Sequence, residues 1–173
     1  MVSRKFRWAL VTGSVAVALA VFGCKQEPQS GVSKENKEYR AQTKGAPKWV
    51  DGDLSEVKMH DKEYSSTFLG RGEDDILNGD VSYATEQAAA KARANLATNL
   101  KSELIKDVQN MTSRSGKTLD KNSSATINLK VDRELVATKQ LARWVGKDKV
   151  WVLVGLDEDI VYKIRAELGL KSK

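Results

Sequence analysis

The longest regular pattern of apolar positions lies between residues 82 and 113, a stretch without glycine or proline. Apolar side chains recur there every seven residues and at neighbouring positions of one helical face. They are Tyr83, Ala90, Ala94, Ala97, Leu100, Leu104, Val108 and Met111. The pattern predicts a helix of about 32 residues, roughly 48 Å long at 1.5 Å per residue. Alanine dominates its first half, so we expect that half to approach its neighbour more closely.

A shorter apolar segment precedes this helix. Residues 64–69 predict a strand, and Gly70-Arg71-Gly72 predicts a sharp turn that closes the strand, because glycine tolerates positive φ. Residues 73–80 are polar and predict a loop. Asp80 or Ser82 is expected to cap the N-terminus of the long helix.

Two further apolar segments predict a β-hairpin. They cover residues 139–145 and 149–156, and Gly146-Lys147-Asp148 between them is short enough for a hairpin loop. The apolar run over residues 150–154 is uninterrupted, which indicates a central, covered strand.

Residues 125–138 fit two patterns. The alternation from Ile127 to Val131 fits a strand, whereas the spacing of Ile127, Val131 and Leu135 fits a helix. We favour the helix because the apolar pair 135–136 breaks the alternation.

A last amphipathic helix is expected to begin at Asp157 or Asp159 and to end before Gly169. The predicted elements together define an α+β fold class. We expect a two-layer sandwich, in which one long helix and shorter helices pack on one face of a small antiparallel sheet.

The N-terminal pattern is different. Three basic residues precede an uncharged, largely apolar run, residues 8–22, which leads into Gly23-Cys24. This order is typical of a secretory signal peptide. The run is shorter than the roughly 20 residues that a membrane span needs.

The cysteine at the first mature position resembles the bacterial lipobox. That resemblance implies signal cleavage between Gly23 and Cys24, a diacylglycerol on the Cys24 thiol and a fatty acid such as palmitate on the new amino group. Such acyl chains would hold the protein on a lipid bilayer more firmly than a single chain, which binds reversibly. The alternative is an unprocessed chain with a buried or unpaired cysteine.

Three segments follow from these patterns. Residues 1–23 are the expected signal peptide, residues 24–46 a lipidated flexible tether and residues 47–173 a single α+β domain. The tether is polar and cannot bury enough apolar surface to offset the entropy of ordering it. Trp49 is expected to anchor the core of the domain.

Charge narrows the range of partners. The chain has 29 Lys and Arg residues against 23 Asp and Glu residues. Three basic residues lie in the signal peptide, so the mature balance is 26 − 23 = +3. Basic and acidic residues alternate along the chain, whereas nucleic-acid binding needs clustered basic residues. We therefore expect no nucleic-acid partner.

No motif predicts catalysis, a cofactor or a metal site. Residues 113–118 end like a phosphate-binding loop, but Met111 stands where the motif needs glycine. His60 is the only histidine, so it lacks the second imidazole of common zinc and acid–base sites. Residues 51–53 and 73–75 do not have the ligand spacing of a calcium loop. We expect a protein that is not an enzyme.

The aromatic residues could serve either ligand binding or packing. Trp49, Trp144, Trp151 and Tyr162 could form a platform for a sugar or a peptide. Trp144 and Trp151 flank the predicted hairpin and could pair across it. We favour packing in the core or on the sheet.

Several blocks of sequence resemble the Lpp-twenty family, and they follow one another through the mature chain. They are the lipobox, Lys44-Gly45-Ala46-Pro47-Lys48-Trp49-Val50, Phe68-Leu69-Gly70-Arg71, Ala90-Lys91-Ala92-Arg93-Ala94-Asn95-Leu96-Ala97, Val145-Gly146-Lys147 and Val152-Leu153-Val154-Gly155-Leu156-Asp157. The resemblance implies a small outer-membrane surface lipoprotein and surface antigen of gastric spiral bacteria, with a dodecin-like sandwich. It also suggests an ortholog of the founding family member. Lys25 is consistent with this location, because aspartate at that position retains some lipoproteins in the inner membrane.

These observations favour a non-enzymatic outer-membrane lipoprotein that presents a small folded module at the cell envelope or surface. Its expected partners are the lipid bilayer, through acylated Cys24, and an envelope or host protein. The alternative is a periplasmic accessory protein of an envelope machine such as the flagellar basal body. A third possibility is a small-ligand binder that uses an oligomeric interface.

Overall fold

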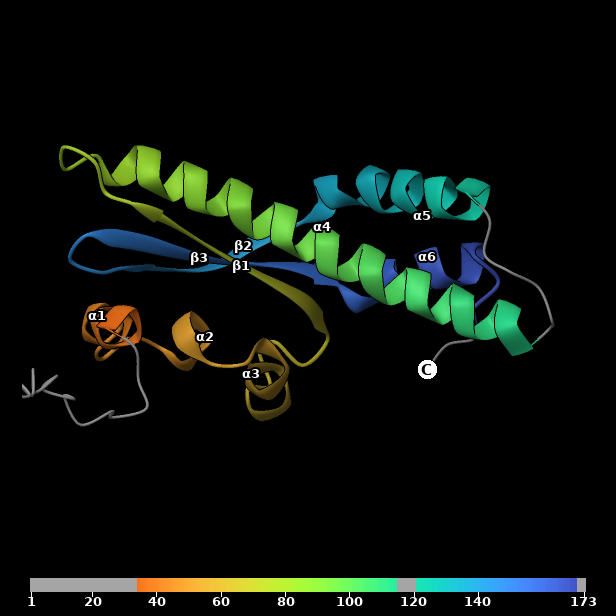
Figure 1. Cartoon of the computed structure of the whole chain (residues 1–173), viewed down its shortest axis with the longest axis horizontal. Coiled ribbons are helices and arrows are strands. Elements are labelled where there is room, and N and C mark those ends of the chain that lie inside the picture. The colour runs from red at the N-terminus through yellow and green to blue at the C-terminus, as the bar shows by residue number, and fades with distance from the viewer. Residues whose placement is uncertain (1–33, 115–120, 171–173) are drawn as a thin grey trace, which may run out of the picture. The chain divides into compact units, whose positions relative to one another are not determined.

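Three antiparallel strands form one sheet in the order β1-β3-β2. The strands are β1 (Thr67–Asp75), β2 (Lys139–Val145) and β3 (Lys149–Asp157). The computed structural model describes residues 34–114 and 121–170, and side chains from 37–114 and 123–170. Residues 150–156 of β3 are all buried, which confirms the predicted hairpin and its central strand (Figure 1).

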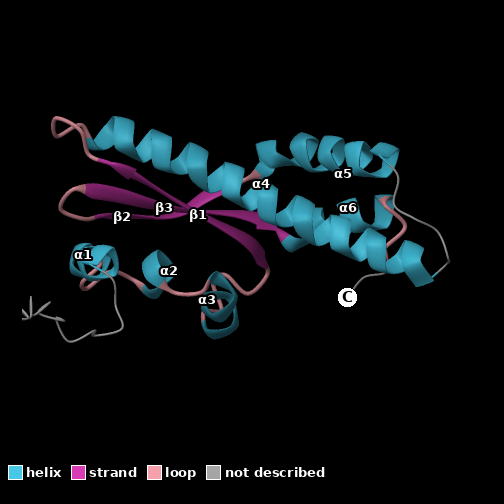
Figure 2. Cartoon of the chain, viewed as in Figure 1, coloured by secondary structure: helices cyan, strands magenta, loops and turns pink. Residues whose placement is uncertain are grey.

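Helices surround this sheet (Figure 2). They are α1 (Lys34–Gln42), α2 (Lys48–Asp51), α3 (Leu54–His60), α4 (Val81–Arg114), α5 (Lys121–Glu134), the 3₁₀ turn η1 (Leu135–Ala137) and α6 (Glu158–Glu167). The α+β class, the long helix and the helical character of α5 and α6 are as predicted. The structure does not describe the expected signal peptide, Gly23, Cys24 or residues 115–118.

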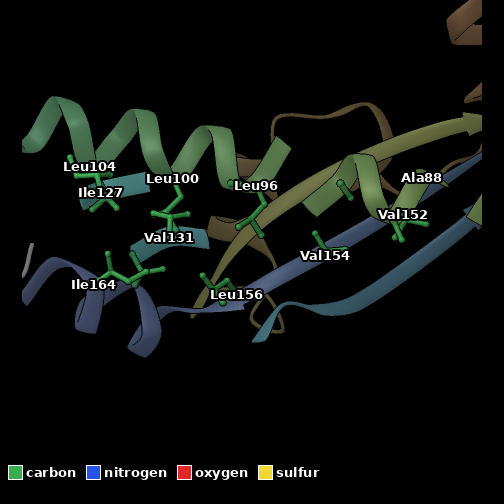
Figure 3. Close-up of a cluster of buried hydrophobic side chains, with 14 of the residues drawn as sticks. Ala88, Leu96, Leu100, Leu104, Ile127, Val131, Val152, Val154, Leu156 and Ile164 are labelled. Carbon is green, nitrogen blue, oxygen red and sulfur yellow. The ribbon is translucent and has the colours of Figure 1, made fainter. Parts of the chain in front are cut away.

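The main core lies between the sheet, α4, α5 and α6 (Figure 3). The buried positions of α4 follow one another every four residues along the helix. They are Ala84, Ala88, Ala92, Leu96, Leu100, Leu104 and Val108, with Ala89 and Ala97 beside them. Steps of four residues rotate the buried stripe by about 40° each. The first half of α4 therefore faces the sheet, and the second half faces α5 and α6.

The predicted face of the long helix is correct only in part. Leu104 is fully buried, whereas Tyr83 and Met111 are 52% and 39% exposed, and Ala90 and Ala94 are also exposed. The buried stripe advances by about 40° every four residues, whereas a strict seven-residue repeat drifts by about 20° per repeat in the opposite direction. The heptad positions and the buried face therefore coincide at Ala97 and Leu104 and separate on both sides of them.

Gly70 and Gly72 lie inside β1, so the predicted sharp turn is wrong. Neither glycine has a positive φ, and the strand continues to Asp75. A Cβ on Gly72 would lie 2.3 Å from the carbonyl oxygen of Ala88 and 2.4 Å from the amide nitrogen of Ala92. The glycines instead allow the backbone of α4 to approach the strand closely.

The turn lies further along the chain. Asn78 and Gly79 have φ values of 53° and 77°, and Asp80 accepts a hydrogen bond from the Tyr83 amide at 2.9 Å. Asp80 thus caps α4, as one of the two candidates predicted.

Helices α1 to α3 lie on the opposite face of the sheet, where a second apolar cluster forms around Trp49, Trp151 and Leu153. The expectation of helices on one face only is therefore incomplete. The predicted tether, residues 24–46, includes α1 in its described part, from residue 34 onward. The hydroxyl of Tyr39 in α1 donates to the carbonyl of Val50 at 3.3 Å, so this part of the tether contacts the domain.

Candidate functional site

Asp53 and Asp74, two acidic residues of the candidate calcium segments, have structural partners. Asp53 caps α3 by accepting a hydrogen bond from the Ser55 amide at 2.7 Å. His60 is exposed at the last position of α3. Asp74 pairs with Lys91 at 2.5 Å. Within the described residues, no group of three or more His, Cys, Asp or Glu side chains could hold a metal ion.

The four aromatic residues do not form one platform. Trp49, Trp144 and Trp151 belong to the cluster beneath the sheet, and Tyr162 is 41% exposed on α6. The rings of Trp144 and Trp151 are 4.8 Å apart between centroids and tilted by 51°, which is the predicted contact across the hairpin.

A concave surface follows the outer edge of β1. One cavity of about 630 Å³ is lined by residues 71–75 of β1, by α4 and by Tyr39. A second cavity of about 730 Å³ is lined by residues 67–69 and 71 of β1 and by parts of α3, α4 and α6. Both are lined by Leu54, Arg71 and Asn99. We call the two together the β1 groove. In Figure 1, β1 passes between α4 on one side and α2 and α3 on the other.

Two side chains hold the walls of the β1 groove to its floor. The guanidinium of Arg71 donates to the carbonyls of Trp49 at 2.9 Å and Gly52 at 3.0 Å, and so ties the strand to the segment around α2. From the opposite wall, the amide of Asn95 on α4 donates to the carbonyl of Arg71 at 2.9 Å.

Ion pairs fasten both ends of the groove. At one end Lys149 bonds Glu73 at 3.0 Å and Asp75 at 3.3 Å. Burial alone would lower the pKa of Lys149, but these two carboxylates outweigh it and raise the pKa above its usual value. Lys149 therefore stays charged and paired at neutral pH.

At the other end, Arg165 is 5% exposed and bonds Glu103 and Asp107 of α4, each at 2.6 Å. Lys58 of α3 pairs with Glu158 of α6. These contacts connect α6 to both walls of the groove.

Arg71 and Asn95 carry no local sequence signal of a binding site. The glycines beside Arg71 suggest a turn, and Asn95 belongs to a block of family resemblance. A strand that continued through Gly70 and Gly72 would have placed Arg71 on the sheet face opposite the long helix, because side chains alternate along a strand.

Among the helices that the structure describes, none combines the length and the apolar composition of a membrane span.

The structure is thus a small α+β domain with a polar groove along a sheet edge. A family model described as LPP20 lipoprotein matches residues 47–157, from the start of α2 to the end of β3. The match covers more than half of the chain, and the protein belongs to the LPP20 (Lpp-twenty) lipoprotein family. A search among curated proteins finds no match.

Proposed function

We propose that this protein is a non-enzymatic outer-membrane lipoprotein that presents its α+β domain to a protein partner at the cell envelope or surface. One observation carries the proposal: a domain of the LPP20 lipoprotein family lies behind an apolar run that leads into Gly23-Cys24. Cys24 is the acylated residue, and cleavage before it removes residues 1–23. The same observation makes the chain a candidate ortholog of the founding family member.

The β1 groove supports a binding role. Its charged side chains are largely engaged in ion pairs with one another, and its walls are held by hydrogen bonds to backbone carbonyls. Such an arrangement suits recognition without covalent chemistry.

Metabolic labelling with an alkyne analogue of palmitate tests the anchor. Wild-type protein should take up the label and sediment with outer membranes on a density gradient. Cys24→Ser should lose the label and leave the membrane fraction, because the thiol is the acylated atom. A Cys24→Ser protein that kept both label and location would contradict the proposal.

Protease treatment of intact cells tests the orientation of the domain. Digestion of intact cells would support display at the surface. Digestion only after the cells are broken would place the domain in the periplasm and favour an accessory role in an envelope machine. A deletion strain with normal motility and flagellar number would then argue against the flagellar basal body as that machine.

A further inference from the structure

The outer edge of β1 carries backbone groups that the sheet does not use. Residues of an antiparallel strand alternate between bonding the neighbouring strand and pointing away from it. The Ile76 amide bonds the carbonyl of Asp148 on the β3 side, and the Arg71 carbonyl bonds Asn95 on the other side. Even-numbered residues of β1 therefore bond β3, and Leu69, Arg71 and Glu73 direct their amide and carbonyl groups into the groove.

Among the described residues, the Arg71 carbonyl is the one outward group of these three residues with a hydrogen-bond partner. Leu69 is only 7% exposed as a residue, and Arg71 and Glu73 are half-buried. An unpaired row of amides and carbonyls along a strand edge is a template for pairing with another extended chain. The side-chain amide of Asn95 occupies one of these places, where the backbone N–H of a neighbouring strand would lie.

The shape of the groove fits one extended chain. Its floor is the nine-residue strand β1, about 30 Å long at roughly 3.4 Å per residue. Residues of α4 line one side of this edge, and Tyr39 of α1 and residues of α3 line the other side. The two cavities share Leu54, Arg71 and Asn99.

The charge of the groove fits an uncharged ligand. Its lining has five basic and six acidic side chains. They are Lys58, Arg71, Lys91, Lys149 and Arg165 against Asp53, Glu73, Asp74, Asp75, Glu103 and Glu158. A nearly neutral lining offers no net field to a polyanion or a polycation, but it complements a neutral peptide backbone.

We propose that the β1 groove binds an extended, uncharged peptide segment of a partner protein, which adds to the sheet as a fourth strand beside β1. Backbone hydrogen bonds to Leu69, Arg71 and Glu73 supply the affinity, as in other cases of strand addition. Asn95 acts as a plug that the peptide displaces from the Arg71 carbonyl. The inference rests on the proposed function for the idea of a partner, and it names the class of that partner and the surface that binds it.

A matched pair of variants tests the groove. Ala90 and Ala94 are both exposed on α4, one turn apart, and only Ala94 lines the groove. Full-length protein in detergent is used to select binders from a phage-displayed library of random nonapeptides. The enriched sequences are then synthesised and titrated. Ala94→Trp should weaken their binding more than tenfold, whereas Ala90→Trp should leave it within twofold of wild type.

Asn95→Ala sharpens the test, because it frees the Arg71 carbonyl. One recovered hydrogen bond should tighten binding about two- to tenfold. Hydrogen exchange should show that the peptide protects the amides of Leu69, Arg71 and Glu73. Failure to enrich any peptide, equal loss in both tryptophan variants, or protection elsewhere would overturn the proposal.

A second copy of the chain is a separate outcome. Protection of residues 69–73 that rises with protein concentration and needs no peptide would show that another copy fills the groove, and would overturn the proposal. A failed peptide titration would overturn the peptide-binding proposal and leave the lipoprotein proposal standing, because the titrations use purified protein. Labelling of Cys24 reports on the anchor alone.

Discussion

The two halves of α4 are buried by different means. Over residues 81–97, buried alanines lie against β1, where Gly70 and Gly72 remove the side chains that would keep the two backbones apart. Over residues 98–114, larger side chains fill the space between three helices. These are Leu100, Leu104 and Val108 of α4, Ile127 and Val131 of α5, and Ile164 of α6.

The difference shows that one helix can be stabilised by close backbone approach at one end and by side-chain volume at the other. On the buried face, we expect added atoms to destabilise the first half, and lost or charged side chains to destabilise the second. The close approach also brings Asn95 to the Arg71 carbonyl, so the packing of the first half shapes the groove.

A charge buried in the second half of α4 should lower the stability of the protein the most. Leu104 is fully buried, and Leu104→Asp would place a carboxylate without a partner among aliphatic side chains. We expect a loss of several kcal/mol in the free energy of unfolding, measured by urea denaturation. Gln109→Asp, at an exposed position of the same helix, is the control and should cost well under 1 kcal/mol. Equal midpoints for Leu104→Asp and wild type would show that the second half is not packed as described.

A single added methyl group should disturb the first half. In Gly72→Ala the new Cβ meets backbone atoms of Ala88 and Ala92, which cannot rotate away. We expect a loss of about 1–3 kcal/mol by overpacking. Asp74→Ala, on the same face of β1, removes only the exposed pair with Lys91 and should cost less than about 1 kcal/mol. If Gly72→Ala melts at the wild-type temperature, close approach does not stabilise this half.

The N-terminal cap of α4 should have a smaller effect. Asp80→Ala removes the acceptor of the Tyr83 amide and should cost about 1 kcal/mol. Asp80→Asn keeps an acceptor and should lie within a few tenths of wild type. Thermal melts of the three proteins check this order, and similar losses in both variants would assign the effect to charge rather than to the hydrogen bond.

Lowering the pH should change the stability of the protein the least, through the contact between α5 and α6. The pKa of Glu167 is lowered, chiefly by a hydrogen bond from Lys130 and then by Arg133. A lowered folded-state pKa gives stability that is present above the ordinary value of 4.5 and lost as pH falls through the folded value. Solvent screens the attraction between Glu167 and these two basic side chains, so the change in stability is small.

Melting temperatures of wild type and Glu167→Gln, followed from neutral pH to below the ordinary carboxyl pKa, measure this contribution. The gap between the two proteins should close as the pH falls. A gap that stays constant would show that the charge of Glu167 does not stabilise the contact.

Elements with strong periodicity could be predicted from the sequence. The hairpin of β2 and β3, the long helix, the cap at Asp80 and the helical choice for α5 follow from local patterns. Helices α2 and α3 could not be recognised in this way, because four and seven residues are too few to show a helical period.

The groove depends on contacts between distant residues. The role of Gly72 becomes visible only when Ala88 and Ala92 lie over it, and glycine in isolation suggests a turn. Similarly, Arg71 is defined by two carbonyls about 20 residues earlier in the chain. Sequence spacing alone carries no signal for such pairings.

The register of the sheet has a consequence for the order of folding. Each residue of β1 pairs with a residue of β3 that lies between 74 and 90 positions later (149 − 75 and 157 − 67). The hairpin of β2 and β3 needs only local contacts, and pairing over long separations is slower because the closing loop is larger. We expect the hairpin to form early and β1 to join it late. The edge that borders the groove would then be completed only in the last stage of folding, so a partially folded chain would offer a peptide nothing to bind.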